Sequence, residues 1–312
     1  MLSRVADNLY WMSRYLERAE HTARVMGVHW NLALENDQRS NTRRWARVLA
    51  CLSNEARPPG NAFSLAQAYA LRQINDGVAA ARENARQVRE QISSEMWEEI
   101  NRLFHESKRF GAPEFLGARS YDMVSTVVQS SHLFQGITDS TMTHGEGWQF
   151  IQAGRYMERI QAVAALIESH FSEFFSEEAE PGVGVSHMEW LGLLQSCTAF
   201  ESYCKVHTAE LRPERVAEFL LLNAEFPHSV RFGVDSLRRS LEAIHQGAAR
   251  RDTDRLGKLA GRLTASLSYT PLEEIMDNLR EFTSGIRRLC NQIHNGIYLT
   301  YISYSLDAAV EA

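Results

Sequence analysis

The chain has 312 residues, with 33 lysine and arginine residues against 39 aspartate and glutamate residues, and a formal net charge of -6 at pH 7. This charge argues against a dedicated nucleic-acid binder, which usually carries a basic surface. Only 7 prolines and 18 glycines are present, so few residues interrupt helices and a turn-rich all-β protein is disfavoured. The length suits one large domain or two ordinary ones.

The cysteines and the hydropathy pattern predict a cytoplasmic protein. The four cysteines have no CxxC spacing and no arrangement typical of a disulfide framework, so we expect reduced thiols. Charges at Arg4 and Asp7 interrupt the N-terminal segment, which therefore does not read as a signal peptide. No apolar run approaches the roughly 20 residues that a membrane span requires, so we expect no membrane association.

The first segment has the clearest helical pattern. Apolar residues from Val5 to Trp30 recur at alternating steps of 4 and 3 residues, which places them on one stripe of a helix. The spacing predicts a long helix over residues 3–35, with Ser3 as its N-cap.

Later segments are divided by loops and helix-start signals. Breaks are expected at residues 58–60, at Pro113 and at residues 180–184, the last being the best linker in the chain. Capping boxes are expected at residues 186–189, and at residues 270–273 with Pro271 as the first helical residue. The second box opens a helix whose apolar stripe runs to Ile293. With no convincing strand pattern, we predict an all-α, multi-helix bundle of about ten helices whose last six residues fray.

An internal repeat divides the chain. Residues 14–18, Arg-Tyr-Leu-Glu-Arg, recur as residues 155–159, Arg-Tyr-Met-Glu-Arg, at an offset of 141, and the apolar stripe moves with them. Residues 45–49 also resemble residues 190–194. We infer two diverged, pseudo-symmetric halves, 1–140 and 141–312, that share one core, because long apolar stripes need partners to cover them.

The charged residues of the first helix lie away from its apolar stripe. One interpretation is a solvated face with ion pairs within the helix, in which Glu17 meets Arg14 and His21. The repeat favours a second interpretation, in which the retained residues pack between the halves or line a shared cleft. In that case they form buried Arg–Glu pairs or bind an anionic ligand. The retained residues are Arg14, Glu17, Arg18, Arg155, Glu158 and Arg159.

Metal, nucleotide and nucleophile motifs are weak. Glu242 and His245 form one Glu-x-x-His unit without the second unit that a di-metal bundle requires, and we predict no metal. Phosphate-binding glycine loops and nucleophile motifs are not found, and we predict no cofactor. The polar residues 141–148 precede a long helix and form either a simple entry loop or an anion site at the helix N-terminus.

Several segments together resemble the bacterial alpha-E domain family. The segment 8–20, Asn-Leu-Tyr-Trp-Met-Ser-Arg-Tyr-Leu-Glu-Arg-Ala-Glu, is similar to the opening motif of that family. Further similar segments follow in order over nearly the whole chain, at residues 81–86, 96–101, 147–159 and 226–232. His144-Gly145 stands where the family has a basic-acidic pair, so a charge-dependent role of that loop is in doubt in this chain.

The resemblance implies an all-helical protein without an established activity. Alpha-E proteins are similar in genomic setting: they lie beside, or are fused to, circularly permuted ATP-grasp proteins, often near transglutaminase-like peptidases and a proteasome-related peptidase. That setting implies an ATP-dependent amide-forming or peptide-modifying system. It is associational and assigns no catalytic role to any residue.

Three functional hypotheses follow. The first is a non-catalytic helical accessory protein of an ATP-grasp ligase-like system. The second is a binding module for an anionic peptide or metabolite that uses the paired Arg and Glu residues. The third is a stand-alone enzyme in which Glu17 and Glu158 act as acid and base, which requires environments that split their pKa values.

Overall fold

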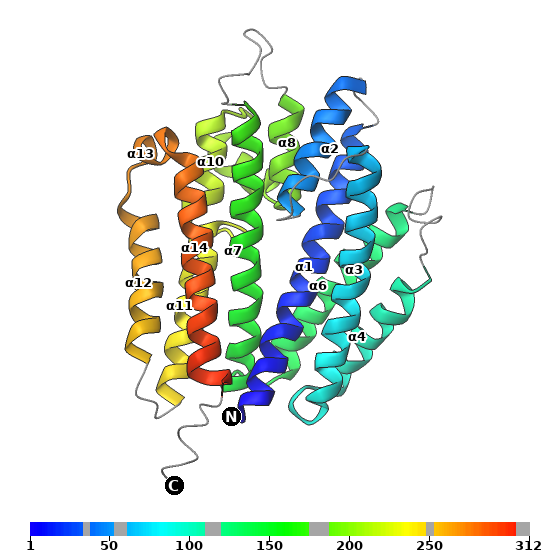
Figure 1. Ribbon diagram of the computed structural model, residues 1–312, viewed down its shortest axis with the longest axis vertical. Helices are drawn as coiled ribbons and strands as arrows, with labels where there is room; N and C mark the ends of the chain where they lie inside the picture. Colours follow the sequence, from blue (N-terminus) through cyan, green and yellow to red (C-terminus); the bar gives the residue numbers. More distant parts are fainter. Residues whose placement is uncertain (34–37, 53–60, 110–119, 175–186, 248–252, 304–312) are drawn as a thin grey trace.

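The computed structural model describes residues 1–33, 38–52, 61–109, 120–174, 187–247 and 253–303 (Figure 1). Within these ranges the protein is all-α, with thirteen α-helices and no strand. The expected breaks at 58–60, Pro113 and 180–184, the residue Ser186 of one capping box, and the tail after residue 303 lie outside the described residues.

The helices follow one another along the chain with short 3-10 and π segments between or after them. The first half of the chain contains α1 (Ser3–Ala33), α2 (Gln38–Leu52), α3 (Ala62–Gln87), η1 (Arg89–Gln91), α4 (Ser94–Ser107) and α6 (Ser120–Thr141). The second half contains α7 (Glu146–Phe174), α8 (His187–Ser196), α9 (Phe200–His207), α10 (Pro213–Leu222), α11 (Val230–Gly247), α12 (Thr253–Tyr269), α13 (Leu272–Asp277), α14 (Leu279–Ile297) and η2 (Tyr298–Ile302).

Two long helices, α1 and α7, lie side by side at the centre of the bundle (Figure 1). Helices α3 and α6 pack on α1, and α4 packs on both of them. Helices α11 and α14 pack on α7, with α12 outside them. The buried apolar side chains of all these helices form one contiguous cluster that extends from Val5 to Tyr301.

The predicted stripe of the first helix is buried as expected. Leu9, Met12, Ala19 and Ala23 have no exposed surface. The described helix spans Ser3–Ala33, and residues 34 and 35 of the predicted helix lie outside the described residues. Because this stripe faces other helices rather than water, burial of its apolar surface stabilises the helix.

Helices α1 and α7 run parallel and approach closely. Their contacts follow the same residue order along both helices. Tyr10 of α1 lies beside Gly154 of α7, and further along His29 lies beside His170. A Cβ atom at Gly154 would lie 2.3 Å from the backbone oxygen of Tyr10 and 3.3 Å from the Cβ of Ser13. Only a residue without a side chain fits at this contact, so Gly154 sets the distance between the two helices.

The segment after Thr270 differs from the prediction of one helix. Pro271 is the N-cap of α13 rather than its first helical residue, and no side chain caps that helix. The helix ends after six residues at Asn278, whose φ of -130° and ψ of 33° are not helical. The backbone oxygen of Asn278 then accepts a hydrogen bond from the amide of Phe282, which starts α14. Divisions of this kind raise the number of helices above the predicted ten.

The cysteines and the hydropathy give two further findings. Cys51, Cys197, Cys204 and Cys290 are all free thiols. None of the helices in the described ranges is long and apolar enough to cross a bilayer.

Candidate functional site

The six repeat residues meet where α1 and α7 pack together. Arg14, Glu17 and Arg18 lie one turn apart on α1, and the corresponding three residues of α7 face them. Both carboxylates are bonded to arginines of the opposite helix. The retained charged residues therefore pack against each other, as the repeat suggested. The solvated face with ion pairs inside the first helix is wrong, since Glu17 is only 3% exposed.

Glu158 of α7 binds two arginines of α1. The Nε of Arg14 donates to its Oε2 at 2.8 Å. Arg18 donates from Nε to Oε1 at 2.5 Å and from Nη2 to Oε2 at 3.0 Å. Burial raises the pKa of Glu158, but the two guanidinium groups lower it further, and the net shift is downward. Glu158 is therefore a carboxylate at neutral pH.

Glu17 of α1 makes the reciprocal interaction with α7. Arg159 donates to Glu17 from Nε at 2.5 Å and from Nη2 at 3.1 Å, and the amide of Gln135 on α6 adds a bond of 3.2 Å. Burial raises the pKa of Glu17, whereas Arg159 lowers it by more, so the net shift is again downward. Arg159 also donates to the backbone oxygen of Pro227 at 3.2 Å, which ties the turn before α11 to the network.

The two carboxylates do not form an acid–base pair of the kind that the enzyme hypothesis requires. A general acid must keep a proton at the working pH, which requires a raised pKa. The pKa values of Glu17 and Glu158 are both lowered. Their oxygens are also occupied by arginine donors. The arrangement resembles a buried structural ion-pair network.

The site includes Tyr10 and His294, which sequence reasoning missed. The Nδ1 of His294 lies 3.1 Å from the hydroxyl of Tyr10 and 3.2 Å from Nη1 of Arg14. Partial burial and the nearby Arg14 lower the pKa of His294 to about 4, so the neutral imidazole accepts these bonds. No sequence signal indicates this contact, because His294 lies 284 residues from Tyr10.

A second part of the site lies one turn further along α1. Arg24 pairs with Glu20 and its Nη2 lies 3.3 Å from the Nε2 of His132 on α6. His21 follows Glu17 by about one turn of α1, and burial lowers its pKa to about 4. The interior therefore contains neutral histidines between charged pairs.

A separate buried ion-pair cluster joins α2 and α8. Arg44 and Arg47 both donate to the carboxylate of Glu189, which was predicted as part of a capping box. Beside them, the rings of His29 and His170 lie 6.0 Å apart. Burial and the two arginines lower the pKa of both histidines well below the usual value. The positions of these histidines differ by the repeat offset of 141 residues.

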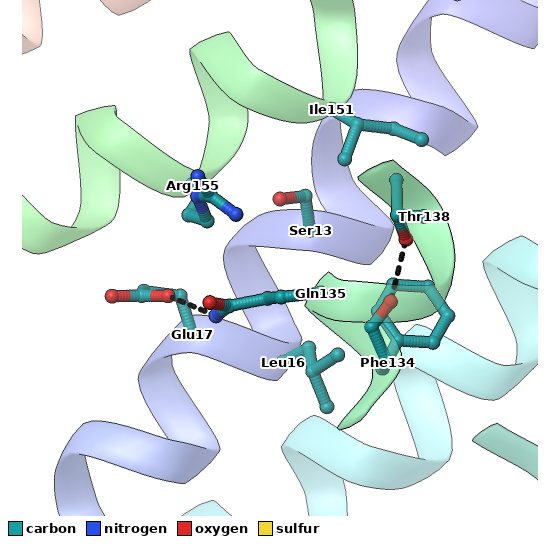
Figure 2. Close-up of a pocket in the computed structure, with 8 residues that line it drawn as sticks. All are labelled: Ser13, Leu16, Glu17, Phe134, Gln135, Thr138, Ile151 and Arg155. Atoms are coloured by element: carbon teal, nitrogen blue, oxygen red, sulfur yellow. Dashed lines mark hydrogen bonds between the residues drawn. The ribbon is translucent and has the colours of Figure 1, made fainter. Parts of the chain in front are cut away.

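Arg155 differs from the other arginines of the repeat because no carboxylate is bonded to it. Its Nη2 donates to the hydroxyl of Tyr156 at 3.1 Å, and its buried Nε has no hydrogen-bond partner. The side chain lines a small pocket with Ser13, Glu17 and Gln135 (Figure 2). Within the described ranges, Arg155 is thus the arginine of the repeat that is not engaged in an ion pair.

Two other sequence features have structural accounts. In the loop before α7, His144 stacks on Trp148 with ring centroids 4.3 Å apart, and Trp148 donates to Asp139 at 3.1 Å. These contacts fit an entry loop that fixes the start of α7. Across the parts of the chain that the structure describes, no group of three or more His, Cys, Asp or Glu side chains is arranged to hold a metal ion.

Glu-Arg dipeptides, which pair across α1 and α7 in this structure, also describe a known protein family. A family model for Alpha-E, described as a predicted alpha-helical domain with a conserved ER motif, matches residues 1–302. The chain belongs to the Alpha-E family. Two Glu-Arg dipeptides of this Alpha-E protein, at residues 17–18 and 158–159, supply both carboxylates of the central network.

The relatives found are longer proteins. Uncharacterized proteins from Mycobacterium bovis and Mycobacterium tuberculosis are 24% identical to this Alpha-E chain over 272 residues. The match covers 77% of this chain and 30% of each relative, so the chain spans less than a third of the relatives' length. No solved structure matches it.

Proposed function

We propose that this Alpha-E protein is a non-catalytic helical accessory protein of a cytoplasmic ATP-grasp ligase-like system that forms amide bonds or modifies peptides. The observation that carries the proposal is that the matching region makes up 30% of the mycobacterial relatives. In those proteins an Alpha-E region lies in one chain with much additional sequence. We infer from this combination that a region of this kind works together with a further protein or domain.

The state of the charged network supports an accessory role over a catalytic one. Glu17 and Glu158 are buried, ionised and bonded to arginines, so they hold α1 against α7. An ATP-grasp enzyme supplies its own nucleotide and magnesium site, and an accessory subunit needs none. The family resemblance supplies the class of partner, and a transglutaminase-like peptidase is a further candidate partner from the same genomic setting.

The same network supports two pseudo-symmetric halves, 1–140 and 141–312, around one core. Arg18 binds Glu158, and Arg159 binds Glu17, so residues 141 positions apart exchange roles across the helix pair. Ser13 and Gly154, which have the same offset, meet at the closest approach of the two helices. This reciprocity is what a duplicated helix packed on its own copy would produce.

Co-purification tests the accessory role. The ATP-grasp protein encoded in the same genome is co-expressed with tagged Alpha-E protein, and the complex is examined by size-exclusion chromatography at micromolar concentrations. We expect co-elution and an increase in product formed per ATP hydrolysed. A partner that elutes alone, with an ATP turnover unchanged by the Alpha-E protein, would contradict the proposal. An unrelated helical bundle at the same concentration is the control.

A second candidate function, the binding of an anionic ligand, is favoured by Arg155. The other three arginines of the repeat are bonded to glutamates. Arg155 keeps a buried donor without a partner, and an arginine fork is well suited to carboxylate recognition. Calorimetry with wild-type protein and the Arg155→Gln variant distinguishes this function from the first, which does not require the guanidinium.

A further inference from the structure

The pocket beside Arg155 is formed by α1, α6 and α7. Its polar lining consists of Ser13, Glu17, Gln135, Thr138 and Arg155. Figure 2 shows the guanidinium of Arg155 and the hydroxyl of Ser13 pointing toward the same space, with the head of Gln135 beside them. Apolar side chains complete the wall. Polar and apolar side chains therefore line one small pocket, which is far smaller than a site that encloses a whole ligand.

Most donors of the pocket are engaged, but one donor atom of Arg155 has no hydrogen-bond partner among the described residues. The buried Nε of Arg155 bonds to no side chain in the described residues. The hydroxyl of Thr138 already donates to the backbone oxygen of Phe134 at 2.7 Å, so its proton is not available to an anion and Ser13 is the hydroxyl left to donate. A buried donor that lacks a partner costs free energy, but this Nε has almost no accessible surface. Arg155 therefore acts on an anion in the pocket through its positive charge, and the Nε takes an acceptor only if neighbouring side chains shift.

The charge around the pocket favours an anion. Five arginines of α1 and α7 surround three glutamates, and each glutamate is paired with at least one arginine other than Arg155. These eight residues carry a net charge of +2, while the other charged residues of the two helices, which are Arg4, Asp7, Glu146, Glu168 and Glu173, bring the total for α1 and α7 to -1. The eight residues are Arg14, Arg18, Arg24, Arg155, Arg159, Glu17, Glu20 and Glu158.

Glu17 lines the pocket without neutralising Arg155 by a hydrogen bond. Both of its oxygens accept from Arg159, and Oε2 also accepts from Gln135. The carboxylate is thus satisfied by other donors. Because Glu17 is paired with Arg159, it repels an incoming anion less strongly than an unpaired carboxylate would.

The size of the pocket limits the ligand. Its volume of about 10 Å³ has room for about one water molecule, which corresponds to one carboxylate oxygen. The second oxygen and the rest of the ligand would remain at the mouth, beside the half-buried Arg155. A phosphate group, with more oxygens around a tetrahedral centre, is a poorer match for one guanidinium fork and this small space.

We infer that this pocket binds a terminal carboxylate, either the C-terminal end of a peptide or a small carboxylic acid, through Arg155 and Ser13. This inference rests on the second candidate function and gives its ligand class. Arg155 supplies the positive charge and Ser13 a hydroxyl donor to the enclosed oxygen, and the carbon atoms next to the carboxylate stay at the mouth of the pocket. No covalent step is involved.

Isothermal titration calorimetry of the full chain at constant ionic strength tests the inference. The probes are N-acetyl-alanine and N-acetyl-trialanine, each compared with its C-terminal amide, together with inorganic phosphate. We expect both acids to bind at least tenfold more tightly than their amides, and phosphate to bind no better than chloride. Tighter binding of the longer acid indicates a peptide end as the ligand, and equal binding indicates a small acid.

Three variants locate the binding. Arg155→Gln is expected to weaken acid binding at least tenfold, and Ser13→Ala, which fits beside Gly154, by several-fold. Arg86→Gln removes the same charge from an exposed pair with Glu83 and is expected to have no effect. Circular dichroism and the melting temperature show whether each variant is folded. If Arg155→Gln does not fold, the effect of Ser13→Ala on acid binding still tests the inference.

The inference is overturned by any of three results. These are equal affinity for acids and amides, phosphate binding as tight as acid binding, and no acid binding at millimolar concentration. Co-purification of Arg155→Gln with the ATP-grasp protein separates the two proposals, because loss of acid binding with an intact complex leaves the accessory role standing. Wild-type protein that binds the acids but does not co-elute with the ATP-grasp protein contradicts only the accessory role, and Arg155→Gln that binds the acids as tightly as wild type contradicts the pocket inference.

Discussion

Removing the negative charge of Glu158 should strand a buried cation. Glu158 accepts three hydrogen bonds, one from Arg14 and two from Arg18. The side chain of Arg18 is 31% exposed and can turn toward water, whereas that of Arg14 is only 6% exposed. In Glu158→Gln, Arg14 therefore keeps its charge in the interior without a counter-ion.

The expected cost is large compared with the stability of a domain. Breaking one partner of a buried ion pair costs about 3–5 kcal/mol, and the ability of Arg18 to rehydrate places Glu158→Gln near the lower limit, at about 3 kcal/mol. Total stabilities are about 5–15 kcal/mol, so the variant should unfold at clearly lower urea concentration. The measurement is urea unfolding followed by circular dichroism, with the m-value checked for two-state behaviour.

Two companion variants identify the cause. Glu83→Gln removes the same charge from a fully exposed pair with Arg86 and should leave the midpoint unchanged. Adding Arg14→Met to Glu158→Gln removes the stranded charge and should restore more than half of the lost stability, since neutral apolar side chains replace buried ion pairs well. A loss below about 1 kcal/mol for Glu158→Gln, the size of a surface pair, would refute the reasoning.

Two further predictions concern the helix contact and the pH dependence. Gly154→Ala places a Cβ 2.3 Å from the backbone oxygen of Tyr10 and should destabilise the protein by about 1–3 kcal/mol. Gly136→Ala, with nothing within 4 Å, should stabilise α6 by up to about 1 kcal/mol; equal effects in urea unfolding would disprove the close contact. The pKa of His294 falls from 6.5 to about 4 on folding, so the unfolded chain binds a proton first. Stability is therefore complete above pH 6.5 and declines as the pH falls toward 4. Replacing His294 with Gln should make this decline shallower, whereas the exposed His105→Gln should not.

The sequence alone determined the helical class and the main helix. The steps of 4 and 3 residues from Val5 to Trp30 follow directly from the helical repeat, and the observed α1 spans nearly the predicted residues. The failure at Asn278 shows the limit of this reasoning. The apolar stripe continues past that residue, yet the backbone of Asn278 leaves the helical region. An apolar stripe indicates which side of a segment is buried, but it does not indicate a bend between two consecutive helices that bury the same side.

The repeat also indicated which charged residues belong together. Glu17 and Glu158 could be selected because each has an arginine three residues before it and another directly after it in both copies of the repeat, and the structure brings them to one interface. The pairing itself was not predictable. An i,i+3 pair such as Arg14 with Glu17 is possible in any helix, and the choice of the opposite helix follows from the parallel packing that Gly154 permits.

Only the tertiary structure decided the state of these groups. Periodicity placed the charged residues away from the apolar stripe, where water was the expected neighbour, but a central helix is covered on several faces by α3, α6, α7 and α8. Burial then forces each carboxylate to take an arginine and each histidine to stay neutral, because an isolated charge in the interior is too costly. The contact of His294 with Tyr10 depends on the path of the whole chain. The donor that Arg155 leaves without a partner is likewise a result of packing, since the sequence gives Arg155 and Arg14 the same local pattern.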